Sequence, residues 1–237
     1  MTNSTMITLD DVRAALQLLD FDAQAAQALM SPVSRRMSPP EGTQPREAGV
    51  LVLLYPEADD LHIVLTRRTD TLRGHSGQVS FPGGSRDPED TSLTETALRE
   101  TCEELGLCGD DIEIIGTLST LYIPPSNFEV MPTVGALAVP PVFQPNRDEV
   151  AEVFTLPLIA LLDDRLKESE MRQLQNVDMR VPFYRVRGHQ VWGATAIMLS
   201  ELEGRLRAVV ASERIAALMN QPDMAETGLN STSTTTG

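Results

Sequence analysis

The sequence predicts an α/β protein in which a mixed β-sheet is flanked by helices. Two observations lead to this fold class. Segments with strand character outnumber the helical segments, and the two kinds are mixed along the chain rather than grouped in separate halves. The chain also has 237 residues, of which 41% are hydrophobic, and this is enough for one sizeable core.

The N-terminal part is predicted to be helical over residues 8–30. Thr8 and Asp11 have the spacing of a capping box, and leucine and valine residues recur on one face of the expected helix. Four prolines with polar neighbours follow, and they predict a linker over residues 31–47.

Strands are expected along most of the remaining chain, with one strong helix among them. Apolar segments bounded by turn residues indicate these strands. The expected strands are residues 48–55, 61–67, 78–81, 112–119, 128–139, 151–156, 183–186 and 190–192. Residues 91–105 make the strongest helix candidate, residues 158–162 a helical turn, and residues 194–219 a last helix with a weak point at Gly204.

The composition excludes several classes of partner. The formal net charge is −15, so the chain repels nucleic acid and anionic membrane surfaces at long range. No apolar run approaches the ~20 residues that span a bilayer. The first ten residues lack the basic flank and apolar stretch of a signal peptide. We therefore expect a cytoplasmic protein, and nothing in the sequence indicates a particular oligomer.

Two cysteines are present, Cys102 and Cys108. Their number and spacing predict neither a disulfide framework nor a metal site. Cys102 falls inside the strongest helix, where we expect it to be a small core residue.

That helix carries three carboxylates close together. Residues 99–107 read RETCEELGL, and on a helix Glu100, Glu103 and Glu104 share one face. Gly106 predicts the end of the helix. Neighbouring carboxylates repel each other, and a hard divalent cation such as Mg²⁺ removes that repulsion. A solvated acidic face is the alternative interpretation of these three residues alone.

Glycines and further acidic residues precede the helix. Gly83 and Gly84 allow a close approach of the backbone to a metal or a phosphate, and an acidic loop follows them. The whole segment resembles the Nudix box, G-x5-E-x7-R-E-U-x-E-E-x-G-U, in which U is apolar. The second half matches from Arg99 to Leu107, with Thr101 at the first apolar position. In the first half, Thr91 occupies the usual glutamate position and Asp90 stands one place earlier.

This resemblance implies a Nudix-type α/β/α sandwich with a mixed sheet and an enzyme that cuts a diphosphate bond. It implies Mg²⁺ or Mn²⁺ as cofactor, held by Gly84, Glu100, Glu103 and Glu104. It also permits two sources for the general base that activates water, either Glu103 in the box or a loop glutamate near the metals. Glu149 and Glu152 are the loop candidates, of which we favour Glu149.

The segment before the box carries a second resemblance. Residues 64–69 read VLTRRT, and Arg73, Gly77 and the FPGG of residues 81–84 follow. These residues resemble the coenzyme A pyrophosphatase branch of the Nudix family, L-L-T-x-R-[SA]-x3-R-x3-G-x3-F-P-G-G. The similarity extends over about residues 48–203. It implies coenzyme A or an acyl-coenzyme A as substrate.

The charges of this segment agree with that substrate class. Arg67, Arg68 and Arg73, with His75, concentrate positive charge in an otherwise acidic chain. Arginine binds phosphate through paired hydrogen bonds, so we expect these three arginines to bind the substrate. Ion pairs with nearby carboxylates remain the alternative for each of them.

The expected organisation has three parts. Residues 1–47 form a helical extension and linker, residues 48–220 the Nudix hydrolase domain, and residues 221–237 a disordered Ser/Thr-rich tail. Two rival functions stay open. The first is a Nudix hydrolase of another substrate, such as NADH, ADP-ribose or a nucleoside triphosphate. The second is a non-catalytic Nudix module that binds a nucleotide or a partner.

Overall fold

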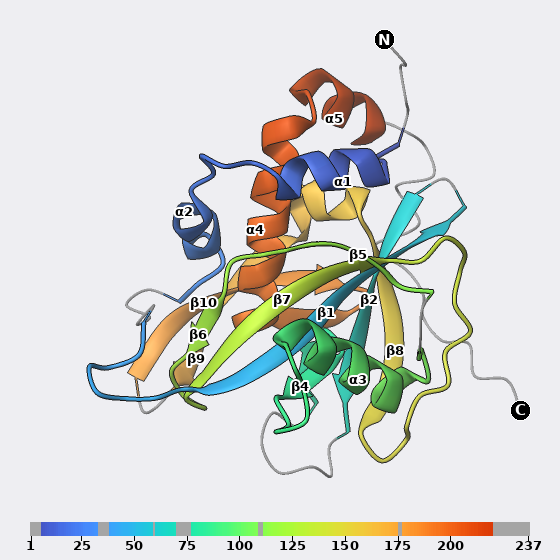
Figure 1. Cartoon of the computed structure of the whole chain (residues 1–237). Helices are drawn as coiled ribbons and strands as arrows, with labels where there is room; N and C mark the ends of the chain where they lie inside the picture. The colour runs from blue at the N-terminus through green and yellow to red at the C-terminus, as the bar shows by residue number, and fades with distance from the viewer. Residues whose placement is uncertain are drawn as a thin grey trace, which may run out of the picture.

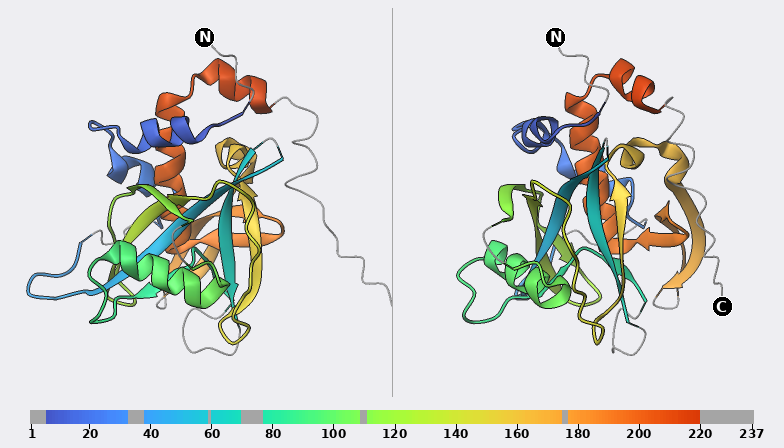
Figure 2. Two further views of the ribbon diagram at one scale, coloured as in Figure 1. Left: turned by 45° about the vertical axis from the view of Figure 1, so that its right-hand side comes forward. Right: turned by 90° about the vertical axis from the view of Figure 1, so that its right-hand side faces the viewer.

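The computed structural model describes residues 6–32, 38–58, 60–69, 77–108, 111–174 and 177–219. Within them, a twisted sheet lies between helix α3 on one side and helices α1, α2 and α4 on the other (Figures 1 and 2). This is the α/β/α sandwich that the sequence predicts. The helices are α1 (Leu9–Leu16), α2 (Ala23–Ala28), α3 (Leu93–Leu105), α4 (Gly193–Val209), α5 (Ser212–Met219) and the short 3-10 helices η1 (Ile159–Leu162) and η2 (Asp164–Leu166).

The main sheet is mixed because β1 runs parallel to β7 and antiparallel to its other neighbours. The strand order is β3-β2-β1-β7-β5, while β4 pairs with β1, β6 with β7 and β8 with β2. Its strands in the described residues are β1 (Arg46–Glu57), β2 (Asp60–Arg68), β3 (Val79–Ser80), β4 (Gly83–Ser85), β5 (Glu113–Thr117), β6 (Leu121–Ile123), β7 (Phe128–Ala136) and β8 (Val150–Pro157).

Both faces of the sheet are covered, and the central strand shows how. Side chains of a strand alternate between the two faces. Leu51 and Leu53 of β1 therefore pack beneath α3, whereas Val52 and Leu54 pack beneath α4. All four are fully buried, which explains why β1 reads as a continuous apolar run rather than as an alternating one.

The helical character expected over residues 8–30 is confirmed in part, because the segment forms two short helices, α1 and α2, with residues 17–22 between them. The capping box of Thr8 and Asp11 is confirmed at the start of α1. Val12, Ala15 and Met30 are buried in the core that α4 shares with the sheet.

The last helix was expected to be weak at Gly204, and this prediction is wrong. Gly204 lies inside α4, and the helix instead breaks at Val210 and Ala211, between α4 and α5. A Cβ atom at residue 204 would lie 2.9 Å from the Phe21 ring and 3.1 Å from the Ala26 Cβ. The glycine thus permits a close approach of the N-terminal segment and does not end the helix.

A second sheet was only half expected. It consists of β9 (Lys167–Leu174), β10 (Val177–Val186) and β11 (His189–Trp192), in the order β11-β10-β9. The β10–β11 hairpin was predicted, although β10 begins earlier than expected. Strand β9 reads KESEMRQL, and its sequence has no regular apolar pattern that would predict a strand. No residue in it is buried.

The two cysteines form a disulfide, so the expectations that they stay unpaired and that Cys102 is a core residue are wrong. Cys102 is half-buried and Cys108 is exposed. The helix stop at Gly106 is confirmed, and its left-handed backbone, with φ of 69°, turns the chain back. This reversal brings the two Cα atoms within 4.5 Å of each other.

In the described part of the chain, no helix has the length and hydrophobicity needed to cross a bilayer. The predicted tail, residues 221–237, lies outside the described residues.

Candidate active site

Helix α3 is the element that carries the candidate metal ligands. Ser92 caps its start by accepting a hydrogen bond from the Glu95 N–H, at 3.1 Å. Ala97, Thr101 and Leu105 are fully buried against the sheet, and their spacing of four residues makes one continuous contact face. Glu100 and Glu104 flank this face, whereas Glu103 lies almost opposite to it and is exposed.

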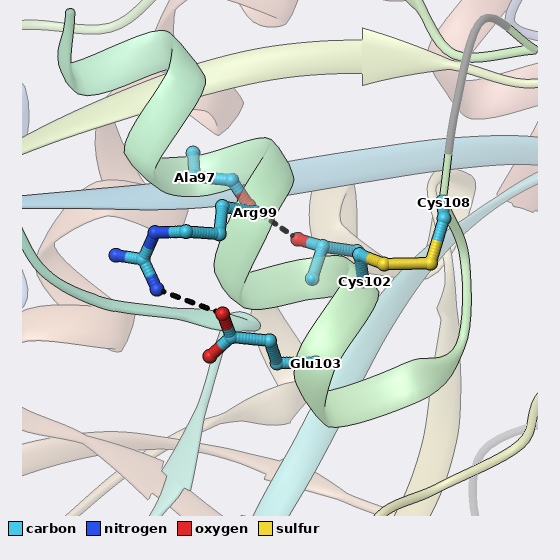
Figure 3. Close-up of a disulfide and its surroundings, with 6 residues drawn as sticks. Ala97, Arg99, Cys102, Glu103 and Cys108 are labelled. Atoms are coloured by element: carbon cyan, nitrogen blue, oxygen red, sulfur yellow. Dashed lines mark hydrogen bonds and ion pairs between the residues drawn. A yellow bond between two sulfur atoms is a disulfide. The ribbon is translucent and has the colours of Figure 1, made fainter. Parts of the chain in front are cut away.

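The three glutamates of α3 lie at different depths. Glu104 is only 5% exposed, the Glu100 side chain is 18% exposed, and the Glu103 side chain is 58% exposed. Glu103 receives a hydrogen bond from Arg99 Nη1 at 3.2 Å (Figure 3). Glu100 and Glu104, one helical turn apart, are the pair that points toward β4.

Strand β4 brings its backbone against these two carboxylates. The Gly83 N–H donates a hydrogen bond to Glu104 Oε2 at 3.3 Å. A Cβ atom on Gly84 would lie 2.5 Å from Glu100 Cδ and 2.6 Å from both carboxylate oxygens. Glycine at residue 84 therefore lets the backbone approach the Glu100 carboxylate closely, whereas the sequence predicted a close approach to a metal or a phosphate.

The loop between β4 and α3 is fastened by an ion pair that sequence reasoning missed. Arg99 donates to Asp90 from Nε at 3.0 Å and from Nη2 at 3.1 Å. Asp90, whose side chain is 4% exposed, also accepts hydrogen bonds from Thr96 Oγ1 at 2.8 Å and the Asp87 N–H at 2.9 Å. The Arg99 guanidinium holds the pKa of Asp90 well below its usual range. The displaced acidic residue of the box is thus the partner of Arg99.

Arg68 lies on the same side of the sheet as α3, and Glu149 directly precedes the strand β8 that pairs with β2. Arg68 is opposite Val150 in the β2–β8 pair, and Val150 belongs to the core beneath α3. The Thr69 N–H donates to the Glu149 carbonyl oxygen at 2.9 Å, which holds the start of β8 against the end of β2. The fold therefore brings a predicted base and a predicted phosphate ligand to the glutamates of α3.

The electrostatics of the site connect these residues. Burial raises the pKa of the Glu104 carboxyl to about 7, and the hydrogen bond from Gly83 opposes this shift. The charges of Glu100 and Glu149 raise this pKa further, while Arg68 lowers it. Burial also raises the pKa of Glu100, to which Glu149 again contributes. These three carboxylates and Arg68 thus act on one another, although they come from three separate segments.

Arg67 and Glu152 lie on the opposite face of the β2–β8 pair. Arg67 Nε is 3.5 Å from Glu152 Oε2, and Glu152 is 3.3 Å from His189 Nε2. His189 stacks on Phe154, which belongs to the core beneath α4. This placement argues against direct substrate contact by Arg67, and it also argues against Glu152 as the base. Arg73 and His75 lie outside the described residues.

Comparison with known proteins decides the family. Residues 45–176, more than half of the chain, match the NUDIX domain. The chain belongs to the Nudix family. Family members generally use divalent cations and bind small nucleotide substrates, so this chain is a Nudix hydrolase of a nucleoside diphosphate derivative.

The relatives agree with the family. The chain is 40% identical to a Pectobacterium atrosepticum protein named uncharacterized Nudix hydrolase NudL, over 67% of this chain and 82% of the relative. It is 34% identical to a Photorhabdus laumondii protein of the same name, over 79% of this chain and 96% of the relative. A crystal structure of a NUDIX hydrolase from Alicyclobacillus acidocaldarius is 18% identical, with a TM-score of 0.48, over 74% of this chain and 97% of that one.

The glutamates of this Nudix chain fit a hard divalent cation. In the residues that the structure describes, no three His, Cys, Asp or Glu side chains stand ready as a metal cluster. However, Glu100 and Glu104 are largely buried, and burial raises the pKa of both carboxyl groups, to which Glu149 adds. Arg99, 3.1 Å from Glu100, opposes the shift at Glu100 only in part. A cation would favour the charged carboxylates, which are the oxygen ligands that Mg²⁺ and Mn²⁺ prefer.

Proposed function

We propose that this Nudix hydrolase cuts the diphosphate bond of coenzyme A or its thioesters. The products are 3′,5′-ADP and 4′-phosphopantetheine or its acyl form. One observation carries the proposal. The coenzyme A pyrophosphatase motif of residues 64–84 runs along β2 to β4, and its Arg68 lies within electrostatic range of Glu104. This proximity supports a single site in which Arg68 is the proposed phosphate ligand and Glu104 the proposed metal ligand.

Each residue of the site has a proposed role in binding the cations or the substrate. Glu100 and Glu104, with the backbone of Gly84, hold the cations, and Glu103 lies at the exposed rim of this cluster. When bound, Mg²⁺ or Mn²⁺ polarises the diphosphate and lowers the pKa of the attacking water. Arg68 contributes a charge-assisted contact to a substrate phosphate. Arg73 is proposed for a similar contact on the strength of the motif alone.

Glu149 is the base that the geometry favours. Its charge acts on both Glu100 and Glu104, which supports a place for it near the proposed cation site. Glu103, in contrast, is 58% exposed and is paired with Arg99 at 3.2 Å. We therefore propose Glu149 as the primary base and retain Glu103 as the alternative.

A substrate panel tests the substrate class. Coenzyme A, NADH, ADP-ribose and dGTP are compared with Mg²⁺ and with Mn²⁺, by following phosphate-containing products. Coenzyme A should show the highest specificity constant. A tenfold preference for a dinucleotide or a triphosphate would overturn the coenzyme A assignment and leave the Nudix assignment intact.

Two glutamine variants test the metal site. Glu100→Gln and Glu104→Gln should each lower turnover by at least about 100-fold, since each removes a ligand charge from the cations. Glu95→Gln makes the same chemical change in the exposed first turn of α3 and should retain near-normal turnover. Near-normal turnover of both site variants, with intact folding, would contradict the metal assignment. It would favour the rival interpretation as a binding module.

A further inference from the structure

The disulfide joins the metal-binding helix to the segment that leaves it. Cys102 lies between Glu100 and Glu104 in sequence, and Cys108 follows the Gly106 turn (Figure 3). The bond closes a loop that contains Glu103 and Glu104. Figure 3 shows the Cys102 side chain pointing away from the Arg99–Glu103 pair, toward Cys108. The disulfide therefore lies beside the site and takes no part in its ion pairs.

The end of α3 is also held from a second direction. The Gln144 N–H donates to the Leu105 carbonyl oxygen and the Asn146 N–H to the Glu104 carbonyl oxygen, both at 2.8 Å. The same segment leads directly to Glu149, whose N–H donates to the Asn146 carbonyl oxygen at 3.1 Å. The last turn of α3 thus links the metal ligand Glu104 to the proposed base.

We propose that Cys102–Cys108 is a thiol–disulfide switch that controls cation binding at α3. In the oxidised form the disulfide holds the last helical turn, with the Glu104 carboxylate against the Gly83 N–H. In the reduced form that turn frays, because helix ends are the least stable part of a helix and one of its two attachments is lost. The inference rests on the proposed role of Glu100 and Glu104 as metal ligands.

A small-molecule dithiol, or two monothiol molecules, supplies the electrons and protons that reduce the disulfide. A thiolate of the reductant attacks one sulfur of the disulfide, and a second thiolate resolves the mixed disulfide. Two electrons and two protons pass to the cysteines, and the reductant leaves as its own disulfide. The exposure of Cys108 makes its sulfur reachable. Disulfides of reducing compartments are usually transient or redox-sensing, which suits the predicted cytoplasmic location.

The first experiment compares the oxidised and reduced full-length protein. The redox state is confirmed by alkylation and mass spectrometry, and dithiothreitol is removed before measurement. Hydrogen exchange of the amides of residues 102–108 should be faster in the reduced form. The Kd for Mn²⁺, followed by electron paramagnetic resonance, should rise about tenfold, as is common when a support of a metal ligand is lost.

Two serine variants provide the matched control. Cys108→Ser and Cys102→Ser should each show the exchange and the Mn²⁺ affinity of the reduced wild type, and neither should respond to dithiothreitol. Equal exchange and equal Mn²⁺ affinity in the oxidised and reduced wild type would overturn the switch. Alkylation of both cysteines under oxidising conditions would overturn it as well. Neither hydrogen exchange nor Mn²⁺ affinity depends on coenzyme A. The test therefore stays decisive even if coenzyme A is not the substrate.

Discussion

At the scale of single residues, the neighbouring Arg67 and Arg68 show how one position along a strand changes the role of a side chain. Both lie in the same segment and carry the same charge, but Arg68 occupies the arginine position of the motif and Arg67 a variable one. Arg68 lies beside Val150 and acts on Glu104, whereas Arg67 pairs with Glu152 on the other face of the sheet. The irregular register between residues 67 and 68 lies where the two roles separate.

We predict that Arg68→Ala lowers kcat/KM for coenzyme A much more than kcat/KM for its 3′-dephospho form. A partly desolvated charge-assisted contact contributes roughly 1.5–3 kcal/mol, which corresponds to a ten- to hundredfold loss of kcat/KM. Arg67→Ala removes the same kind of side chain from the opposite face of the sheet. It should change kcat/KM for either substrate only slightly. The measurement is kcat/KM for the two substrates with each variant. An equal loss on both substrates would assign Arg68 to the diphosphate or to the structure instead.

Asp60 provides a pH-dependent prediction that is independent of catalysis. Its carboxylate accepts hydrogen bonds from the Leu61 N–H at 2.8 Å and the Ile159 N–H at 3.1 Å, and burial raises its pKa to about 6. In the unfolded chain this carboxyl group has its ordinary pKa of 3.8. The protonated form is therefore favoured by folding, and the stability that it provides is complete below about pH 4 and lost as the pH rises through 6.

Asp60→Asn should remove this pH dependence. Between pH 4 and pH 7, the free energy of unfolding of the variant should rise relative to that of the wild type by about 2 kcal/mol, which follows from the size of the pKa difference. Urea unfolding of both proteins across this pH range measures it. A difference between the two proteins that stays constant with pH would contradict the prediction.

At the scale of elements, the site depends on how closely β4 and α3 approach each other. Gly83 and Gly84 let the strand backbone lie against Glu104 and Glu100. On the neighbouring strand, a Cβ atom at Gly49 would collide with the Leu93 carbonyl oxygen of α3. Glycines in adjacent strands thus allow the helix to pack directly on the backbone of the sheet, and this brings the carboxylates to their place.

Gly84→Ala and Gly49→Ala should distinguish an effect on the carboxylate site from an effect on the packing of α3 against the sheet. The new methyl group at residue 84 meets the end of a flexible side chain, so Glu100 moves and the fold remains. We expect turnover to fall at least about tenfold with little change in unfolding temperature, because small displacements at a reacting centre are costly. At residue 49 the methyl group meets backbone, so the unfolding temperature should fall. Normal turnover of Gly84→Ala would show that Glu100 has room to adjust.

At the scale of the whole molecule, the N-terminal helices share a core with the sheet. The side chain of Glu201 in α4 is fully buried and accepts hydrogen bonds from Gln27 Nε2 at 2.8 Å and the Ser119 N–H at 3.0 Å. It also pairs with Arg205 at 2.9 Å. One buried carboxylate therefore connects the N-terminal segment, the β5–β6 link and α4.

Met30→Ala and Leu29→Ala test whether this segment unfolds together with the sheet. Met30 is 2% exposed and belongs to the core, whereas Leu29 is 70% exposed. The first variant should lower the free energy of unfolding by about 2–5 kcal/mol, and the second should change it by less than about 0.5 kcal/mol. Thermal unfolding monitored by circular dichroism measures both. A separate early transition in Met30→Ala would show that the N-terminal helices unfold as their own unit.

The sequence by itself determined the features that depend on local spacing. The α3 helix, its end at Gly106, the capping box of Thr8 and the runs of the central strands all follow from patterns within one or two turns or strands. The family follows from motifs of the same kind, because the chemistry of a diphosphate site needs glycines and carboxylates at set distances along the chain.

Only the tertiary structure decided which of those residues meet. Strand β9 has no apolar pattern because it is stabilised by its hydrogen bonds to β10 and by ion pairs such as Glu168–Arg185. The depth of Glu104 and its nearness to Glu149 depend on how segments distant in sequence pack, and a local pattern carries no information about this. The Cys102–Cys108 bond depends on the direction of the chain after Gly106. These contacts arise from the burial of the whole core, which acts over distances that no short sequence spacing records.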